Sequence, residues 1–442
     1  PSASVGWRLS EESFLSSARS WLSNLKVRYS YGNLGNQQVG YYDYLRTINI
    51  GTQSYLFGDK LPSSASISAP VSSNLTWETV EHHNIGLDAS FFNNRLTFTG
   101  EAYIRNTKDM LTAGISLPAT YGTSSPRMNS ADMQTKGYEL SLGWQDMFKL
   151  AGKPFSYQVN LTFNDYTSEI TKFNNPEKAF AKGYYEGMRI GEIWGYHIDG
   201  LFATDEEAAS YEVDQRRVND IINSSSGALK GLHAGDLRFA DLDGDNIIST
   251  GENTVDNPGD RRIIGNSEPR YQYGANLAFQ WYGFDFSVFF QGIGRMDWYP
   301  AHEAELFWGP FNRAYATFLP KNFLEQCWSE ENPNAYFPRP RAYVAYDNMG
   351  DQCRELTAKN DRYLQNIGYC RLKNLTVGYT LPKNWTRKAG IDMLRVYFSG
   401  ENLACWSGIK TDYVDPEQAR RGGDLKVYPW QKTFTFGINV NF

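Results

Sequence analysis

The sequence predicts an all-β fold, an antiparallel barrel that crosses a membrane and carries long loops on one side. Three observations support this class. Apolar and polar residues alternate in many segments, several of these segments exceed ten residues, and short connections between them alternate with very long ones. A tilted strand of about 9 to 11 residues spans a bilayer, and membrane barrels combine short turns at one end with long loops at the other.

The alternation is clearest in RLTFTGEAYIR, residues 95–105. Leu96 and Phe98 fall on one face of this segment, whereas Thr97 and Glu101 fall on the other. A period of two is the spacing of side chains along a strand. The same pattern predicts nine further strands, at residues 25–32, 84–92, 138–144, 157–164, 271–281, 284–291, 375–382, 394–402 and 433–442.

Strands of a soluble β-sandwich and of a barrel in lipid both alternate apolar and polar residues, so alternation cannot distinguish the two folds. The lengths of the connections can. Asn93 and Asn94 join two strands directly, and about two residues at Gly283 join another pair. Long connections of roughly 25 to 105 residues separate these turns, at residues 33–79, 108–132, 166–270, 297–362 and 404–430. A compact soluble domain rarely contains structureless loops of this length. We therefore favour the membrane barrel over a soluble sugar-binding β protein.

Composition narrows the function classes. The chain has 43 Lys and Arg against 49 Asp and Glu, which gives no reason to expect a nucleic-acid partner. It has no run of 18 apolar residues of the kind that forms a transmembrane helix. Aromatic residues make up 15% of the chain. Several stand near predicted strand ends, where barrels carry interfacial girdles, although packing of a core would use the same rings: Trp144, Trp281, Tyr282, Tyr379 and Tyr397.

One segment of the connection 166–270 has the ligand spacing of an EF-hand loop without flanking helices. It reads DLDGDNIISTGE, and its turn parity places it outside the cell, where calcium is abundant. Asn246 stands at the position that EF-hands give to Gly, and Asn tolerates the left-handed backbone needed there. The spacing predicts a structural Ca²⁺ with ligands from Asp241, Asp243, Asp245, the Ile247 carbonyl, Ser249 and Glu252. The alternative is a turn held only by side chain-to-backbone hydrogen bonds.

Several longer segments resemble a known family. GDLRFADLDGDNIISTGE is followed by DRRIIGNSEPRYQYGANLAFQWYGFDFSVFFQG, and WLSNLKVRYSYGNLGNQ, NIGLDASFFNNRLTFTGEAY, RLKNLTVGYTLP and RVYFSGENL occur in the expected order. Together they resemble the SusC/RagA-like TonB-dependent transporters of the Bacteroidota outer membrane, over nearly the whole chain.

The resemblance implies that residues 1–442 form the C-terminal part of a 22-stranded barrel, a size at which the lumen holds a plug. The plug, the energy-coupling segment and the earlier strands are then expected upstream. It also implies an outer-membrane protein surrounded by lipid that actively imports an oligosaccharide or a peptide, with a SusD-like surface lipoprotein and the TonB complex as partners. No catalytic residues and no organic cofactor are implied. The alternative function is a passive porin or an adhesin-type barrel, which needs neither plug nor energy source.

The long loops suggest where the lipoprotein sits. The segment 300–323 brings Phe307, Trp308, Phe311 and Tyr315 close together in sequence. Large exposed apolar patches and aromatic anchors mark protein interfaces. We expect this segment and the connection 166–270 to form the docking surface, unless the aromatic rings instead pack inward against other loops.

Cysteines and histidines define no further site. Cys327 and Cys353 share one long loop, while Cys370 and Cys405 fall nearly opposite each other on consecutive strands. An exported protein can form disulfides, but sequence does not fix their connectivity, so bridges and free thiols both remain open. The histidines show no metal-site spacing: His82, His83, His197, His233 and His302.

Overall fold

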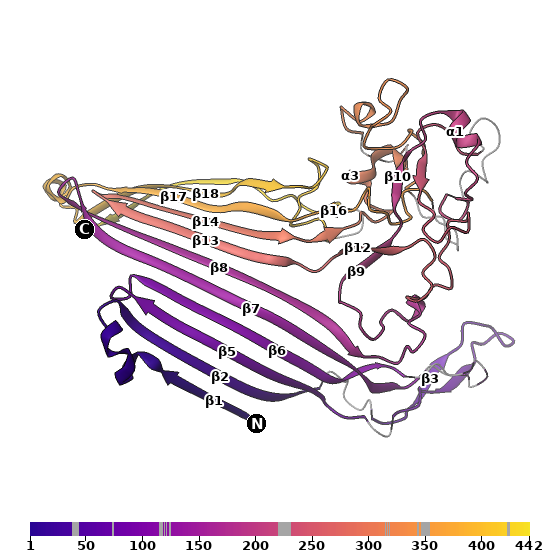
Figure 1. Cartoon of the computed structure of the whole chain (residues 1–442), viewed down its shortest axis with the longest axis horizontal. Coiled ribbons are helices and arrows are strands. Elements are labelled where there is room, and N and C mark those ends of the chain that lie inside the picture. Colours follow the sequence, from indigo (N-terminus) through magenta and orange to yellow (C-terminus); the bar gives the residue numbers. More distant parts are fainter. Residues whose placement is uncertain are drawn as a thin grey trace. The chain divides into compact units, whose positions relative to one another are not determined.

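In the computed structural model shown in Figure 1, strands make up most of the regular secondary structure. It describes residues 1–37, 44–72, 75–114, 118, 120, 122, 125–219, 231–313, 315, 317, 319–342, 344–345, 354–421 and 425–442. The chain divides into two compact units. The first comprises residues 1–89, 99–138 and 166–190, and the second comprises residues 90–98, 139–165 and 191–442.

Eleven strands form one large sheet in the order β1-β2-β5-β6-β7-β8-β13-β14-β17-β18-β19. Their bounds are β1 Ser2–Arg8, β2 Leu22–Asn36, β5 Glu78–Phe91, β6 Leu96–Ala113, β7 Arg127–Leu150, β8 Lys153–Lys172, β13 Arg270–Trp281, β14 Phe284–Arg295, β17 Tyr369–Thr380, β18 Met393–Ser407 and β19 Thr433–Asn441. All ten predicted strands are therefore present. The prediction missed β1, whose seven residues offer only Val5 and Trp7 as alternating large apolar positions.

Shorter and longer connections alternate along the sheet, but the connection predicted at 108–132 is only 114–126, no longer than 9–21, because β6 and β7 extend into it. The short ones span residues 9–21, 92–95, 151–152, 282–283 and 381–392, and the long ones span 37–77, 114–126, 173–269, 296–368 and 408–432. Two of the short turns have only two residues, Ala151-Gly152 and Tyr282-Gly283, all with positive φ. Two consecutive positive φ angles define the type I′ turn, which matches the twist of a β-hairpin.

The two faces of the sheet differ in polarity within the second unit. Residues opposite one another on six neighbouring strands form an apolar row: Tyr157, Phe279, Phe286, Val377, Phe398 and Phe436. The adjacent row, on the other face, is small and polar: Gln158, Ala278, Ser287, Thr376, Ser399 and Thr435. On β19 the apolar side chains are exposed, with Phe436 at 80% and Ile438 at 66%. A barrel wall in lipid has this pattern, because its apolar face needs no protein core.

The long connections contain structure that the sequence analysis did not predict. Four two-stranded sheets form there: β3 Ile48–Thr52 with β4 Ser63–Ile67, β9 Glu192–Gly195 with β12 Arg262–Asn266, β10 Ile198–Leu201 with β11 Leu237–Phe239, and β15 Asp297–Trp298 with β16 Gln365–Asn366. The described α-helices are α1 Asp205–Ala209 and α3 Glu305–Trp308 in the long connections and α4 Lys383–Thr386 in the short connection 381–392. Short 3-10 helices span Leu9–Glu11, Ser13–Ala18, Phe180–Lys182, Gly309–Phe311, Leu324–Gln326 and Arg387–Ala389. None of the described helices has the length and apolar character that crossing a membrane requires.

Three of the long connections pack together in the second unit, and we refer to them as the loop layer. It comprises the described residues of 191–269, 296–368 and 408–432. One hydrophobic core contains side chains from all three segments, among them Phe239, Trp308, Tyr363 and Val414. These connections are thus a folded layer rather than structureless loops, because they are long enough to bury apolar surface of their own.

Candidate functional site

The acidic loop predicted to bind calcium lies in the loop layer between β11 and β12. Carboxylate oxygens of Asp241, Asp243 and Asp260 lie within 4.8 Å of one another. Asp260 is fully buried and accepts hydrogen bonds from the backbone N–H groups of Leu242, at 2.8 Å, and Ser249, at 2.7 Å. Asp260 was not among the predicted ligands. It lies outside the twelve-residue EF-hand pattern. The one local signal in the sequence is the preceding Gly259, a residue type typical of turns.

Of the predicted carboxylate ligands, Asp245 and Glu252 are not in this group, while the Ile247 carbonyl and the Ser249 hydroxyl stay predictions. The carboxylate of Asp245 accepts a hydrogen bond from Ile247 N at 2.8 Å, and the Ser249 hydroxyl accepts one from Gly251 N at 3.0 Å. Glu252 is exposed and is not one of the converging carboxylates. The left-handed conformation expected at Asn246 is present, with φ of 63°. Side chain-to-backbone bonds of this kind are also what the metal-free interpretation of the turn requires.

The electrostatics of the three carboxylates favour a cation. Burial, together with the charges of Asp243 and Asp241, raises the pKa of Asp260, against the opposing effect of its two backbone donors. Desolvation also acts to raise the pKa of Asp241, but the N–H groups of Asn246 and Gly244 outweigh it and lower that pKa. Like charges held this close repel, and a hard cation such as Ca²⁺ with oxygen ligands would relieve the repulsion. Asp241, Asp243 and Asp260 could therefore hold a metal ion.

A second group of charges is buried in the core of the loop layer. Arg341 Nη2 lies 2.9 Å from Asp236 Oδ2, and Glu355 accepts a hydrogen bond from Leu237 N. Desolvation raises the pKa of Asp236 to about 6 and that of Glu355 to about 8. When Glu355 is protonated, the only charges left in this group are the Asp236 carboxylate and the Arg341 guanidinium, and they neutralise each other. These residues hold β11 in place and face no described cavity, so we assign them to structure.

The predicted aromatic docking patch is wrong for three of its four residues. Phe307, Trp308 and Phe311 are buried in the loop-layer core, and only Tyr315 is exposed, at 79%. The indole N–H of Trp308 donates to the Ala301 carbonyl at 2.9 Å. Hydrophobic side chains in a loop of this length gain more from packing with the other two connections than from standing in water.

The cysteines of the described chain are free thiols. Cys370 lies opposite Trp406, and Cys405 lies opposite Arg371, so the two thiols are one register step apart and point to opposite faces of the sheet. A disulfide between them is excluded by this geometry. Cys327 is buried, and desolvation raises its pKa to about 12. Cys353 lies outside the described residues.

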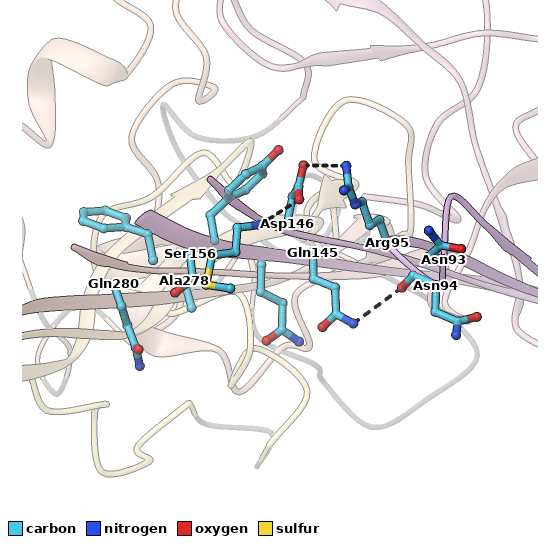
Figure 2. Close-up of a pocket in the computed structure, with 12 residues that line it drawn as sticks. Asn93, Asn94, Arg95, Gln145, Asp146, Ser156, Ala278 and Gln280 are labelled. Atoms are coloured by element: carbon cyan, nitrogen blue, oxygen red, sulfur yellow. Dashed lines mark hydrogen bonds and ion pairs between the residues drawn. The ribbon is translucent and has the colours of Figure 1, made fainter. Parts of the chain in front are cut away.

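The sheet itself offers a polar wall near its short turns. A pocket of about 530 Å³ lies beside the turns at 92–95 and 151–152. Figure 2 shows the residues that line it. Arg95 Nη1 lies 3.4 Å from Asp146 Oδ2 beside it, and Gln145 donates to the Asn94 carbonyl at 3.5 Å. A second pocket of about 580 Å³ shares three lining residues with the first, Met147, Ser156 and Gln280. Both pockets are lined by a mixture of polar and apolar side chains, since Met147, Phe279 and Trp281 stand beside Gln145, Ser156 and Gln280.

Comparison with known proteins identifies the family. Residues 1–403 match the family described as TonB dependent receptor-like, beta-barrel. The chain belongs to this family. TonB-dependent receptor barrels lie in the outer membrane and serve transport rather than enzymatic catalysis. The predicted location and barrel class are therefore confirmed, and the apolar rows of the sheet are the lipid-facing side of its wall.

Individual relatives agree with this assignment. TonB-dependent receptor P3 of Formosa agariphila is 28% identical over 467 residues, covering all of this chain and 42% of the relative. TonB-dependent receptor SusC of Bacteroides thetaiotaomicron is 26% identical over 454 residues, covering all of this chain and 40% of the relative. The solved structure of the RagAB peptide transporter shares the fold, with a TM-score of 0.70 at 22% identity over all of this chain and 43% of that one. The resemblance to SusC and RagA is thus confirmed, and the chain spans about two fifths of the length of these relatives.

Proposed function

We propose that this chain is part of the barrel subunit of an active outer-membrane importer of large nutrients. The observation that carries the proposal is the family match over residues 1–403, together with the alignment of the entire chain to SusC. Eleven antiparallel strands are half of a 22-stranded barrel. This count supports placing residues 1–442 in the C-terminal part of such a barrel, with a plug and an energy-coupling segment upstream.

The partners in this proposal are a SusD-like surface lipoprotein and the TonB complex. The lipoprotein would sit on the loop layer, the part of the second unit that stands clear of the lipid-facing rows. Among the described residues of the segment after α3, three large apolar side chains are exposed: Tyr315 at 79%, Leu319 at 63% and Leu324 at 73%. Exposed apolar groups of this kind suit a protein interface better than the buried Trp308 and Phe311 do.

The cargo in this proposal is an oligosaccharide or a peptide. The inner row of the wall, from Gln158 to Thr435, is uncharged, and Arg395 on the same face is paired with Asp285. Hydroxyls and amides bind sugars and peptide backbones through hydrogen bonds without retaining a strongly charged ligand. This wall suits the passage of either cargo.

Growth of a deletion strain on single glycans and single peptides tests the proposal. Import predicts loss of growth on one cargo class, recovery on complementation, and no recovery when TonB is inactivated. Uptake that continues without TonB would instead support the passive porin. An unchanged growth profile on every cargo, in a strain shown to express the protein, would contradict nutrient import.

We also propose that the acidic loop binds a structural Ca²⁺. Asp241, Asp243 and Asp260 would supply the carboxylates, and the ion would fix the loop between β11 and β12. Calcium titration calorimetry of the detergent-purified protein tests this, with Asp260→Asn compared against the matched Asp245→Asn. Loss of binding in Asp260→Asn with retention in Asp245→Asn supports the converging group. The reverse pattern would support the EF-hand spacing, and no heat of binding in the unmodified protein would eliminate the site.

A further inference from the structure

Two aromatic rings stand on the polar face of the sheet in the second unit. The first ring belongs to a row of directly opposed residues on this face: Asn160, Asn276, Phe289, Asn374, Glu401 and Thr433. Phe289 is the one large apolar residue of this row, and it is 38% exposed. Its neighbour Phe290 belongs to the apolar face, where it is opposite Ala275 and Leu372. The strand register therefore places the Phe289 ring in water rather than in lipid.

The second ring belongs to the loop layer. Trp430 is 39% exposed, and its ring centroid is 5.0 Å from Nζ of Lys373 on β17. Lys373 directly precedes Asn374, the residue opposite Phe289. A cation over the face of an indole is attracted by the ring. Lys373 thus fastens Trp430 to the strand that runs beside Phe289.

Ion pairs place this part of the loop layer on the polar face. Arg371 is opposite Gln291, in the next row of that face. Arg371 Nη2 lies 2.6 Å from Asp415 Oδ2, and Lys373 Nζ lies 2.8 Å from Glu417 Oε1. The charges of both cations are therefore already neutralised by carboxylates of the loop layer.

The segment that carries Trp430 is fixed on both sides. Gln418 Nε2 donates to the Tyr428 carbonyl at 2.8 Å, and Asn402 Nδ2 of β18 donates to the Gln431 carbonyl at 3.3 Å. A ring that is already held in place loses little conformational freedom when a ligand binds.

The polar side chains around the two rings retain hydrogen-bonding groups for a ligand. Within the described part of the chain, the side chains of Asn276 and Glu401 have no hydrogen-bond or ion-pair partner, and the Asn374 amide only accepts, from Thr376 at 3.3 Å. The backbones of β13, β14, β17 and β18 are paired on both sides within the sheet. A peptide cannot add to them as a further strand, so recognition on this face depends on side chains.

We propose that Phe289 and Trp430, with the polar side chains around them, bind an uncharged oligosaccharide on the inner wall of the barrel. The C–H face of a pyranose ring packs on an aromatic ring, while amides and a carboxylate bind the hydroxyl groups at its edge. Neighbouring strands lie about 4.8 Å apart, and a lysine side chain adds to the separation of the two rings. Only a glycan of several units therefore covers both.

Charge favours a neutral glycan. Glu401 is the one charged residue of the row, and its free carboxylate repels uronate and sulfate groups. Arg371 and Lys373 offer no free cation to such groups, because Asp415 and Glu417 already bind them. The inference rests on the proposed import function, and it narrows the cargo from an oligosaccharide or a peptide to an uncharged oligosaccharide.

Binding of the full-length protein, purified in detergent, to immobilised probes tests the proposal. The probes are neutral glycans, glycans with uronate or sulfate groups, and peptides, each two or six units long. We expect retention on a neutral hexasaccharide and at least tenfold weaker binding to its disaccharide. Retention only on acidic glycans, only on peptides or on no probe at all would overturn the proposal. The last result is the one expected if the upstream plug covers both rings.

Substitutions on the two faces of the same strands locate the site. Phe289→Ala and Trp430→Ala should each weaken binding of the hexasaccharide about tenfold or more, because each removes an aromatic anchor. Phe290→Ala and Trp406→Ala are the matched controls on the apolar face, and they should leave binding unchanged. Equal losses in the two pairs, or no loss in the first pair, would overturn the proposal.

The charge argument has its own variant. Glu401→Gln should strengthen binding of a uronate-containing hexasaccharide at least threefold, because the repulsion is removed. The neutral hexasaccharide should not gain in the same way. An unchanged affinity for the acidic glycan would contradict the selection by charge.

A photoreactive derivative of the hexasaccharide provides a measurement on the unmodified protein, which decides the matter if a variant does not fold. Illumination should label residues 428–433 or the part of β14 around Phe289. Labels confined to other segments would overturn the placement of the site. None of these experiments measures uptake. A glycan that is bound and not imported would contradict the proposed transport alone, whereas unchanged import by the double variant Phe289→Ala/Trp430→Ala would contradict the site alone.

Discussion

The sheet and the loop layer use the same residue types in opposite ways. Phe436 of β19 is 80% exposed, whereas Phe311 in the loop layer is fully buried. The sheet turns its large apolar side chains toward lipid and its small polar ones inward, while the loop layer packs aromatics around a water-excluding core. One chain thus folds against two solvents. Whether an apolar side chain is buried or exposed depends on whether it faces lipid or water. Alternation therefore predicted the strands, but it did not predict which loop residues are buried.

The largest expected effect comes from emptying the loop-layer core. Trp308→Ala should reduce the free energy of unfolding of this layer by about 3–5 kcal/mol, since it removes buried surface and leaves a cavity. Phe436→Ala on the sheet should cost about 1.5–3 kcal/mol, because lipid or detergent fills the vacated space and only the transfer term is lost. Denaturant titrations followed by circular dichroism and by limited proteolysis of the loops measure both. An equal loss in the two variants would mean that the regions are not packed differently.

Removing a buried cation should have a comparable effect in the loop layer and a small one on the wall. Arg341→Met leaves Asp236 and Glu355 buried without a guanidinium, and we expect a loss of about 3–5 kcal/mol. Arg395→Met breaks its pair with Asp285, where both side chains are partly exposed, and should cost less than about 1 kcal/mol. The same unfolding titration compares the pair. A larger loss of stability in Arg395→Met than in Arg341→Met would contradict the view that the loop core excludes water while the inner wall is solvated.

The stability of the loop layer should also depend on pH in a defined direction. Burial raises the pKa of Glu355 from 4.5 to about 8, so the folded layer retains this proton where the unfolded chain releases it. Its contribution is complete below about pH 4.5, is lost as the pH rises toward 8, and changes no further above that. Asp236, whose pKa is raised to about 6, acts in the same direction at lower pH. Thermal midpoints of the loop layer from pH 5 to 9 should fall less in Glu355→Gln. Parallel curves for both proteins would exclude Glu355 as the source.

The smallest effect on stability is expected at the exposed apolar residues of the loop layer. Tyr315→Ser and Leu324→Ser should change the unfolding free energy by no more than about 0.5 kcal/mol, because both side chains are mostly exposed. Under the proposed function, they should nevertheless reduce recovery of the surface lipoprotein from detergent-solubilised membranes. Full recovery with the double variant would remove this part of the loop layer from the docking surface.

The sequence predicted those structural features that depend on residues close together in the chain. Period-two alternation identified ten of the eleven strands, and Asn93-Asn94 and Gly283 marked turns that the structure confirms. The loop layer depends on contacts between segments far apart, such as Phe239 with Trp308 and Val414 in one core, and no local pattern encodes them. Asp260 was missed for the same reason. It meets Asp241 and Asp243 through a return of the chain after Glu252, where backbone N–H groups of Leu242 and Ser249 hold its carboxylate.

The length of β7 has a consequence for the height of the protein above the membrane. Its 24 residues extend over roughly 80 Å at about 3.3 Å per residue, while about 9 to 11 residues suffice to cross the hydrocarbon layer. More than half of the strand must therefore stand in water, still hydrogen-bonded as part of the sheet. Membrane thickness does not set where this strand ends. Its far end therefore lies beyond the hydrocarbon layer, away from the lipid.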